Sequence, residues 1–166
     1  MKKSYYIVIV GLLFIASLVS AQTVNKNIFR IERNKNANVV MYDVRLDNNG
    51  NIDKINPIDA YWLLYTKQGQ REEITVFEKK AYGFKVTYND NGYYTLVLKA
   101  VPDRVIKVVT VKGEPKAEIK INNKETYLST VYVFANDGLI PKVLYYILTG
   151  TDIETGMRVS EKITVK

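Results

Sequence analysis

The sequence predicts an all-β domain, predominantly antiparallel, folded as a two-layer β-sandwich or a barrel-like sheet with one short helix near residues 71–82. Segments in which apolar and polar residues alternate with a period of two follow one another along the chain. Turn-forming dipeptides separate them about every ten to fifteen residues, a spacing typical of sandwiches and barrels. Alternation is the same in both architectures, so the sequence leaves the choice between them open.

The first predicted strands lie next to two Asn-Gly turns. The segments 40–46 and 84–88 alternate apolar with polar residues, and Asn-Gly dipeptides follow them at 49–50 and 91–92. Asn and Gly tolerate the positive φ angles that tight hairpins require. We therefore expect a hairpin at each place, the second of which leads into a strand over 93–101.

The C-terminal half continues the same pattern. Further strands are expected over 105–112, 117–121, 127–134, 143–149 and 159–165, with turns at Asn122-Asn123, at Asp137-Gly138 with Pro141, and at Thr155-Gly156. The segments 105–112 and 127–134 are apolar on both faces, which indicates strands that are covered from both sides.

One segment, residues 71–82, breaks the alternation. Its apolar residues stand at helical offsets: Ile74, Phe77, Ala81 and Tyr82. Acidic residues open the segment and lysines close it, which suits the helix dipole, and Gly83 can cap the end in a left-handed conformation. The β-branched residues Thr75 and Val76 favour a strand instead, but we predict one short helix.

Residues 1–21 have the features of a secretory signal peptide. Lys2 and Lys3 precede an apolar run over 7–18, and the small residues Ser20 and Ala21 end the segment. The run is shorter than the roughly 20 apolar residues that a membrane-spanning helix needs. We expect cleavage after residue 21, leaving residues 22–166 as a single β-rich domain that has no transmembrane segment and is periplasmic or secreted.

The amino-acid composition limits which kinds of catalysis and metal binding are available to the chain. The chain contains no Cys and no His, so disulfides, thiol chemistry and Ser-His catalysis are excluded, and zinc-type sites lose their usual ligands. Glycine-rich phosphate loops of the nucleotide-binding kind are missing as well. We expect no cofactor and no metal, and a core that is large enough to fold without disulfides.

The chain is basic, with a formal net charge of +7 that falls by two when Lys2 and Lys3 leave with the signal peptide. Outside the cytoplasm such a surface meets envelope glycans or anionic lipid headgroups, and we expect no nucleic acid partner. The basic residues are interspersed with acidic ones, and solubility alone also explains this pattern.

Oxygen-bearing side chains at every second position offer one metal-binding alternative: Asp47, Asn49, Asn51 and Asp53. Calcium loops present their first ligands with this spacing, but they also require a glycine at the sixth position and a glutamate at the twelfth. Position six is Ile52 and position twelve is Ile58. We interpret the segment as a polar hairpin loop.

Carboxylate pairs offer the one enzymatic alternative, a glycan hydrolase, which needs two acids about 5 to 9 Å apart. Five acids lie nearest to apolar or aromatic residues: Glu32, Asp43, Asp59, Glu78 and Glu161. Nothing in the sequence pairs any two of them, so we assign no catalytic residue and expect that the protein is not an enzyme.

Aromatic residues give the more informative signal. Tyr61, Trp62 and Tyr65 fall in one predicted strand, where Trp62 points to one face and the two tyrosines to the other. Exposed Tyr and Trp rings stack on sugars and serve as contact points for protein partners. Alternatively, Trp62 anchors the core and the tyrosines line a second layer.

Several segments resemble, in order and spacing, the uncharacterised exported bacterial family of unknown function numbered 4833. They are 31–34, 38–43, 57–62 and 77–83, followed by Gly150 and Thr155-Gly156 before Glu161. The resemblance implies export but no mechanism. Together with the aromatic pattern, it selects these candidate ligand-binding residues: Arg33, Asn36, Asn38, Tyr42, Tyr61, Trp62, Glu78 and Tyr82.

Such a mixture of arginine, amides, rings and a carboxylate can hold a polar ligand through hydrogen bonds and stacking. The same residues can instead tie strand ends to the helix through a buried Arg33–Glu78 pair. We favour a non-catalytic binding module for a glycan, a lipid headgroup or a protein. The first alternative is a carrier of lipids or other small apolar ligands with an internal cavity, and the hydrolase ranks last.

Overall fold

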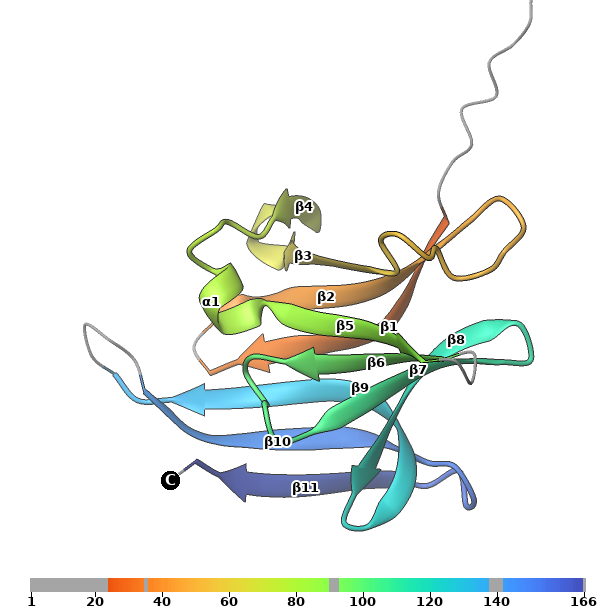
Figure 1. Cartoon of the computed structure of the whole chain (residues 1–166). Coiled ribbons are helices and arrows are strands. Elements are labelled where there is room, and N and C mark those ends of the chain that lie inside the picture. Colours follow the sequence, from red (N-terminus) through yellow and green to blue (C-terminus); the bar gives the residue numbers. More distant parts are fainter. Residues whose placement is uncertain (1–23, 35, 90–92, 138–141, 166) are drawn as a thin grey trace, which may run out of the picture.

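The computed structural model describes residues 24–34, 36–89, 93–137 and 142–165, and it confirms an all-β fold (Figure 1). Its elements are β1 (Val24–Arg33), β2 (Asn36–Leu46), β3 (Ile58–Leu64), a 3-10 turn (Tyr65–Lys67), β4 (Gln70–Glu73), α1 (Lys79–Tyr82), β5 (Phe84–Asn89), β6 (Tyr93–Leu98), β7 (Val105–Val111), β8 (Glu114–Ile121), β9 (Lys124–Ala135), β10 (Val143–Asp152) and β11 (Arg158–Thr164). The predicted signal peptide with its cleavage site, the turn at 91–92, and Gly138 with Pro141 lie outside the described residues.

The strands form one curled sheet that branches at β9. One edge of β9 pairs with β10, which pairs in turn with β11. The other edge is shared, because its first part pairs with β8 and its later part pairs in parallel with β1. Two wings diverge from this edge, β1-β2-β3-β4 and β8-β7-β6-β5. Every strand pairing described is antiparallel except that of β1 with β9, so the fold is predominantly antiparallel, as the sequence predicts.

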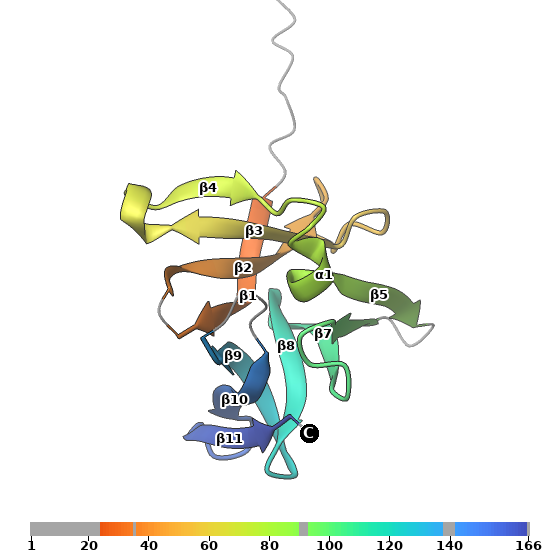
Figure 2. The ribbon, with the colours of Figure 1, turned by 90° about the vertical axis from the view of Figure 1, so that its left-hand side faces the viewer.

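The two wings curl toward each other and enclose the core, as Figures 1 and 2 show. Aromatic rings join the wings: Tyr42 of β2 stacks on Phe29 of β1 and meets the edge of Phe84 of β5. The edges of β4 and β5 do not pair, and α1 lies on the connection between them. The architecture is therefore a half-barrel rather than a closed barrel.

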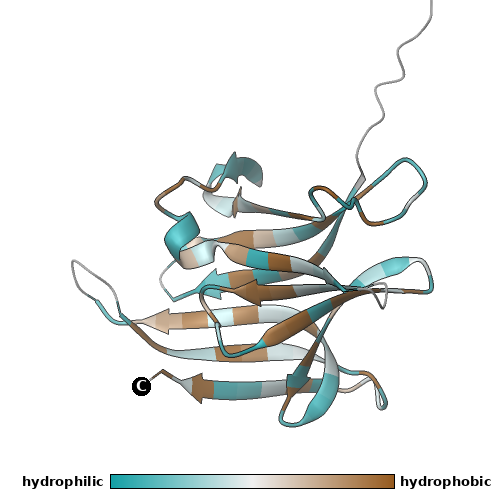
Figure 3. Cartoon of the chain, in the orientation of Figure 1, coloured by the Kyte–Doolittle hydropathy of each residue, from teal (hydrophilic) through white to brown (hydrophobic). Residues whose placement is uncertain are grey.

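Alternation along the strands produces this arrangement. In β8 the residues from Pro115 to Ile121 alternate between buried and accessible, so that one face packs in the core. Figure 3 shows the resulting alternation of hydrophobic and hydrophilic residues along the ribbon. Asn122 and Asn123 adopt φ angles of 50° and 62° and form the predicted turn between β8 and β9. A turn of the same kind at Lys112-Gly113, which the sequence analysis does not identify, joins β7 to β8.

The predicted helix near 71–82 exists only in its last turn, Lys79–Tyr82, because its first part is strand β4. Pairing with β3 takes precedence there over the helical spacing of apolar residues. Gly83 does not adopt the predicted left-handed cap, since its φ is −69°. Glycine is needed at position 83 for steric reasons, because a Cβ atom there would collide with the carbonyl oxygen of Lys79. Among the described residues, no helix has the length and apolarity to cross a bilayer.

Candidate functional site

Five of the eight residues predicted for ligand binding come together beneath α1. We call Arg33, Tyr42, Trp62, Glu78 and Tyr82 the α1 cluster. The Arg33 Nη1 donates to the Tyr82 hydroxyl over 2.5 Å, and the Tyr42 hydroxyl donates to the Tyr82 carbonyl oxygen over 2.6 Å. The rings of Trp62 and Tyr82 meet edge to face with centroids 5.1 Å apart. The cluster thus fastens α1 to β1, β2 and β3.

The expected Arg33–Glu78 ion pair does not form in the described chain. Glu78 instead accepts hydrogen bonds from the Trp62 Nε1 at 3.0 Å and from the Thr75 hydroxyl at 2.7 Å, while Arg33 donates to Tyr82. Burial alone would raise the pKa of Glu78, but the hydrogen bonds from Thr75 and Trp62 lower it. Burial raises the pKa of Tyr42 and of Tyr82. These partners are all internal, so the α1 cluster has a structural role.

Asn36 and Asn38 lie near the hairpin between β1 and β2. The Asn36 Oδ1 accepts from the Asn38 backbone N–H at 3.0 Å. The Asn38 Oδ1 accepts from the backbone and the hydroxyl of Thr66 at 3.3 and 3.1 Å. The Asn36 side chain thus bonds locally within β2, whereas Asn38 links β2 to the 3-10 turn that follows β3.

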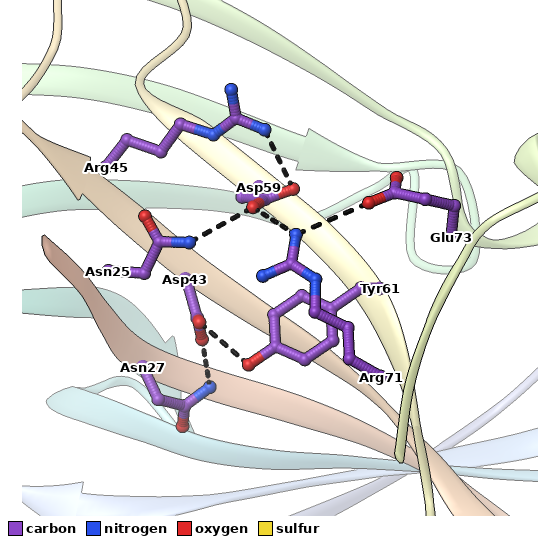
Figure 4. A network of polar contacts seen from close by, with 8 residues as sticks. All are labelled: Asn25, Asn27, Asp43, Arg45, Asp59, Tyr61, Arg71 and Glu73. Atoms are coloured by element: carbon purple, nitrogen blue, oxygen red, sulfur yellow. Dashed lines mark hydrogen bonds and ion pairs between the residues drawn. The ribbon is translucent and has the colours of Figure 1, made fainter. Parts of the chain in front are cut away.

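Tyr61 points to the opposite face of β3 from Trp62, as predicted, whereas Tyr65 lies in the 3-10 turn and not in the strand. Tyr61 belongs to a second polar cluster (Figure 4). This outer-face network comes from four adjacent strands and consists of Asn25, Asn27, Asp43, Arg45, Asp59, Tyr61, Arg71 and Glu73. Asp43 and Asp59 stand opposite each other in the β2–β3 register and are only 4% and 6% exposed. Two carboxylates so close and so buried require compensation.

Two arginines compensate Asp59. The Arg71 Nη2 lies 2.7 Å from Asp59 Oδ2, the Arg45 Nη2 lies 3.1 Å from Oδ1, and Asn25 adds a hydrogen bond at 3.2 Å. Burial alone would raise the pKa of Asp59, but the hydrogen bonds and positive charges of Arg71 and Arg45 outweigh it and lower the pKa. Asp59 is therefore ionised at neutral pH.

Neutral donors surround Asp43. It accepts hydrogen bonds from the Asn27 amide at 3.0 Å and from the Tyr61 hydroxyl at 2.9 Å. Burial and the bond to Asp43 raise the pKa of Tyr61 to about 12. The Arg71 guanidinium lies 3.9 Å above the Tyr61 ring, a cation–π contact that covers the ring. The Asn25 Oδ1 is buried without a hydrogen-bond partner, one unsatisfied atom in the described part of this network.

This arrangement does not suit glycosidase chemistry. A general acid needs a raised pKa, whereas the pKa of Asp59 is lowered and its oxygens are held by two arginines. Of the other acids considered for hydrolysis, Glu161 pairs with Arg104 at 2.5 Å and Glu32 pairs with Arg30 at 2.6 Å. Each has a structural partner.

Asp43, Asp59 and Tyr61 are recognisable in the sequence, whereas their partners Asn25, Asn27, Arg45 and Arg71 are not. Alternation along β2 could have indicated one of these partners, Arg45, because Asp43 and Arg45 share the face of β2 that is opposite to Tyr42. Arg71 stands across from Leu63 in the register of β3 and β4, which brings it within reach of Asp59. This register cannot be predicted from the sequence of either strand alone.

A groove of about 400 Å³ opens beside the outer-face network, and we call it the α1 groove. Because β4 pairs only with Tyr61–Leu64, the edge of β3 over 58–60 is uncovered, and the groove lies between this edge and the start of β5. Ile58, Ile74 and Phe84 supply apolar lining, and the charged lining residues are Arg45, Asp59, Glu73, Lys79 and Lys99. In the described chain neither Lys79 nor Lys99 has an ion-pair partner.

Beside this groove, the loop between β4 and α1 exposes two large apolar side chains. Val76 is 83% exposed and Phe77 is 77% exposed, and we call the two residues the tip. Lys80 lies with its Nζ 5.4 Å from the centre of the Phe77 ring. Figure 3 shows this hydrophobic loop beside α1, and Figure 2 views the molecule from that side. The tip is not predicted from the sequence, because the helical spacing of Phe77 indicates a packed side chain.

The segment with calcium-like spacing forms hydrogen-bonded turns. The Asp47 Oδ1 accepts from the backbone of Asn49 and of Asn51, each at 2.9 Å. The Asp53 Oδ1 accepts from the backbone of Ile55 at 2.7 Å. Among the described residues, no group of three or more acids is placed to hold a metal ion.

A family model matches residues 29–162, and its description is a domain of unknown function, DUF4833. The chain belongs to this family. No curated protein and no solved structure matches the chain. The match confirms the family that the order and spacing of segments indicate, and the candidate sites therefore depend on their geometry.

Proposed function

We propose that this DUF4833 protein is an exported, non-catalytic domain that attaches to anionic lipid surfaces of the cell envelope through the tip and the α1 groove. The observation that carries the proposal is the position of two exposed apolar side chains, Val76 and Phe77, directly beside a groove with unpaired lysines. The basic charge of the chain and the predicted signal peptide are consistent with it.

The tip has the chemistry of an interfacial anchor. Burying a Phe or Val side chain in an apolar phase is favourable by about 1.5 to 3 kcal/mol. Val76 and Phe77 are exposed to water in the folded chain, so they would gain this free energy only on entering such a phase. Lys79 and Lys80 follow the tip, and lysines near an anionic surface contribute about 1 kcal/mol each. Apolar side chains next to basic ones are the pattern by which peripheral proteins bind lipid interfaces.

The α1 groove offers a place for one headgroup. Lys79 and Lys99 are available to a phosphate group, and Glu73 accepts hydrogen bonds from hydroxyl or amine groups of the same headgroup. Phe84, a partly exposed lining residue, suits the glycerol backbone or the first carbons of an acyl chain.

The carrier alternative receives no comparable support. Large side chains fill the space between the wings, among them the fully buried Tyr42, Phe29 and Leu96. The α1 groove opens at the uncovered edge of β3, and the core residues Ile58, Ile74 and Tyr82 form part of its wall. A lipid held there would be bound at the surface and not enclosed.

Vesicle co-sedimentation tests the proposal. The purified chain should bind vesicles of phosphatidylglycerol and phosphatidylethanolamine, and bind phosphatidylcholine vesicles much more weakly. Replacing Val76 and Phe77 with Ser should weaken binding to the anionic vesicles by about tenfold or more, because apolar burial is lost. Ile55→Ser is the matched control, since Ile55 is 86% exposed and lies in the loop 47–57, far from α1 in Figure 1.

Binding that is equal for the wild type and the V76S/F77S variant would contradict the role of the tip. A loss of the same size in Ile55→Ser would contradict it as well, because any exposed apolar residue would then serve. The replacement of Lys79 and Lys99 with Gln should reduce the preference for anionic vesicles and leave the weak binding to phosphatidylcholine unchanged.

A further inference from the structure

A second groove, of about 740 Å³, lies where the sheet branches, and we call it the fork groove. Along the shared edge of β9, pairing with β8 ends at Tyr127 and pairing with β1 begins at Thr130. Leu128 and Ser129 pair with neither of these strands. The branching of the sheet therefore leaves a hollow between β1 and β8, and β9 forms its floor.

The floor of the fork groove is irregular on its other side too. The pairing of β9 with β10 shifts between Thr149 and Gly150, which makes Ser129 the extra residue of a β-bulge. The Ser129 hydroxyl donates to the Thr149 carbonyl oxygen at 3.0 Å. A Cβ atom on Gly150 would collide with the Tyr127 carbonyl oxygen and lie 2.5 Å from the Thr126 methyl group. Glycine at position 150 therefore allows β10 to pack closely against β9 beside the bulge.

The charges that line the fork groove are all positive: Arg30, Lys116 and Arg158, with no acidic residue among the lining side chains described. Lys116 and Arg158 have no ion-pair partner in the described chain. Arg30 is ion-paired with Glu32 through its Nε at 2.6 Å, and among the described residues its two terminal guanidinium nitrogens have no hydrogen-bond partner. The lysine nearest to the N-terminal end of β1, Lys26, is instead neutralised by Glu114 at 2.7 Å.

We propose that the fork groove binds a segment of an acidic polysaccharide. The two arginines are suited to sugar carboxylates, because a guanidinium binds a carboxylate through two parallel hydrogen bonds. The hydroxyls of Ser129, Thr130 and Thr151 line the same groove and suit the hydroxyl groups of the sugar rings. A lipid is a poorer match, because the apolar lining residues Ile28 and Leu128 are buried and offer an acyl chain little surface.

This site goes beyond the proposed attachment to lipid. The fork groove and the α1 groove have no lining residue in common. The tip belongs to the connection between β4 and β5, whereas the fork groove is built from β1, β8, β9, β10 and β11. The two sites can therefore be tested separately.

Isothermal titration of the full chain with an oligomer of galacturonic acid tests the proposal, with a neutral malto-oligosaccharide of equal length as comparison. The acidic oligomer should bind, increasing salt should weaken its binding, and the neutral oligomer should not bind. Replacing Arg30, Lys116 and Arg158 with Gln should weaken binding by about tenfold for each charge removed. Lys85→Gln, an exposed change on β5, is the matched control and should bind like the wild type.

Thr151→Val separates recognition of a sugar from simple attraction to an anion. This change keeps the shape and all three charges, so it should weaken binding of galacturonate severalfold and leave binding of inorganic polyphosphate unchanged. Thr151 is exposed, so the variant should fold like the wild type. The V76S/F77S variant should keep the wild-type affinity for galacturonate, whatever its effect on vesicle binding.

Three outcomes would overturn the proposal: no binding of the acidic oligomer by the wild type, equal affinity in the triple variant, or an equal loss with Lys85→Gln. Tighter binding of polyphosphate than of galacturonate, unaffected by Thr151→Val, would also overturn it and indicate a general polyanion site. Loss of vesicle binding in the triple variant, with no saccharide binding by the wild type, would assign the groove to lipid instead.

Discussion

The outer-face network and the tip are separated by only a few residues of chain, yet their charged groups are satisfied in different ways. In the network, Asp59 is held by Arg45 and Arg71, and the guanidinium of Arg71 lies on the Tyr61 ring. Beside the tip, by contrast, Lys79 and Lys80 have no ion-pair partner among the described residues, and Phe77, whose ring centre lies 5.4 Å from the Lys80 Nζ, is exposed. Internal satisfaction of polar groups indicates a structural role, whereas unpaired charge beside exposed apolar surface indicates a surface for a partner.

The largest effect that tests this comparison is expected from Trp62→Ala in the α1 cluster. The change removes a buried ring that packs on Tyr82 and donates to Glu78, and it should lower the free energy of unfolding by about 3 to 5 kcal/mol. Urea unfolding followed by circular dichroism measures the loss. The V76S/F77S variant should stay within about 0.5 kcal/mol of the wild type, because both replaced side chains are exposed.

The next effect is expected from Asp59→Asn in the outer-face network. Loss of the carboxylate leaves Arg45 and Arg71 facing a neutral amide and should cost about 2 kcal/mol of unfolding free energy. The partial exposure of both arginines reduces the cost below that of a fully buried pair. Glu73→Gln is the control, since Glu73 is exposed and lies 3.5 Å from the same Arg71, and it should change little.

A double-mutant cycle that combines Asp59→Asn with Arg71→Gln sharpens this measurement. The two changes should be non-additive, because each removes the same contact. If Asp59→Asn were as stable as the wild type, the network would not be structural, and its carboxylate would be a candidate for ligand binding.

The smallest effect is expected in the pH dependence of stability. Hydrogen bonds from Lys124 and from the backbone of Thr155 and Glu154 lower the pKa of Asp152 to about 2. A lowered pKa in the folded state means that the stabilisation is complete above the unfolded value of about 4 and is lost as the pH falls toward the folded value. The urea concentration at the unfolding midpoint should therefore decrease as the pH is lowered from about 5 to about 2.

Asp152→Asn should make this fall smaller, because the variant has one fewer carboxylate that must be protonated. Glu154→Gln, at an exposed position in the same turn, serves as its control. A wild-type midpoint that rises on acidification would contradict the sign, and an unchanged profile in Asp152→Asn would contradict the assignment to this residue.

Much of the fold is predictable because it depends on residues that are close in sequence. The hairpin of β8 and β9 follows from alternation on both sides of Asn122-Asn123. The opposite faces of Trp62 and Tyr61 follow from the period of a strand. Where two local signals compete, as over residues 71–82, the prediction extends the helix too far, because pairing of β4 with β3 outweighs helical spacing.

The candidate sites are less predictable, because they depend on register and on strands that are distant in sequence. Arg33 and Tyr82 are both selected from the sequence, but nothing in either segment indicates that the two side chains bond to each other. The tip is missed because an apolar residue at a helical offset is normally packed, and the loop that exposes Phe77 depends on where β4 ends.

By itself, the sequence determined the all-β class, most of the hairpins, the absence of thiol and histidine chemistry, and the membership in a family of unknown function. Only the tertiary structure decided that β1 joins β9 in parallel, that the sheet branches there, and that Arg30, Lys116 and Arg158 line one groove. Periodicity and turns act between neighbours in the chain, whereas the pairing of β1 with β9 joins residues about a hundred positions apart. That long-range pairing creates the fork groove, which no single segment of the sequence encodes.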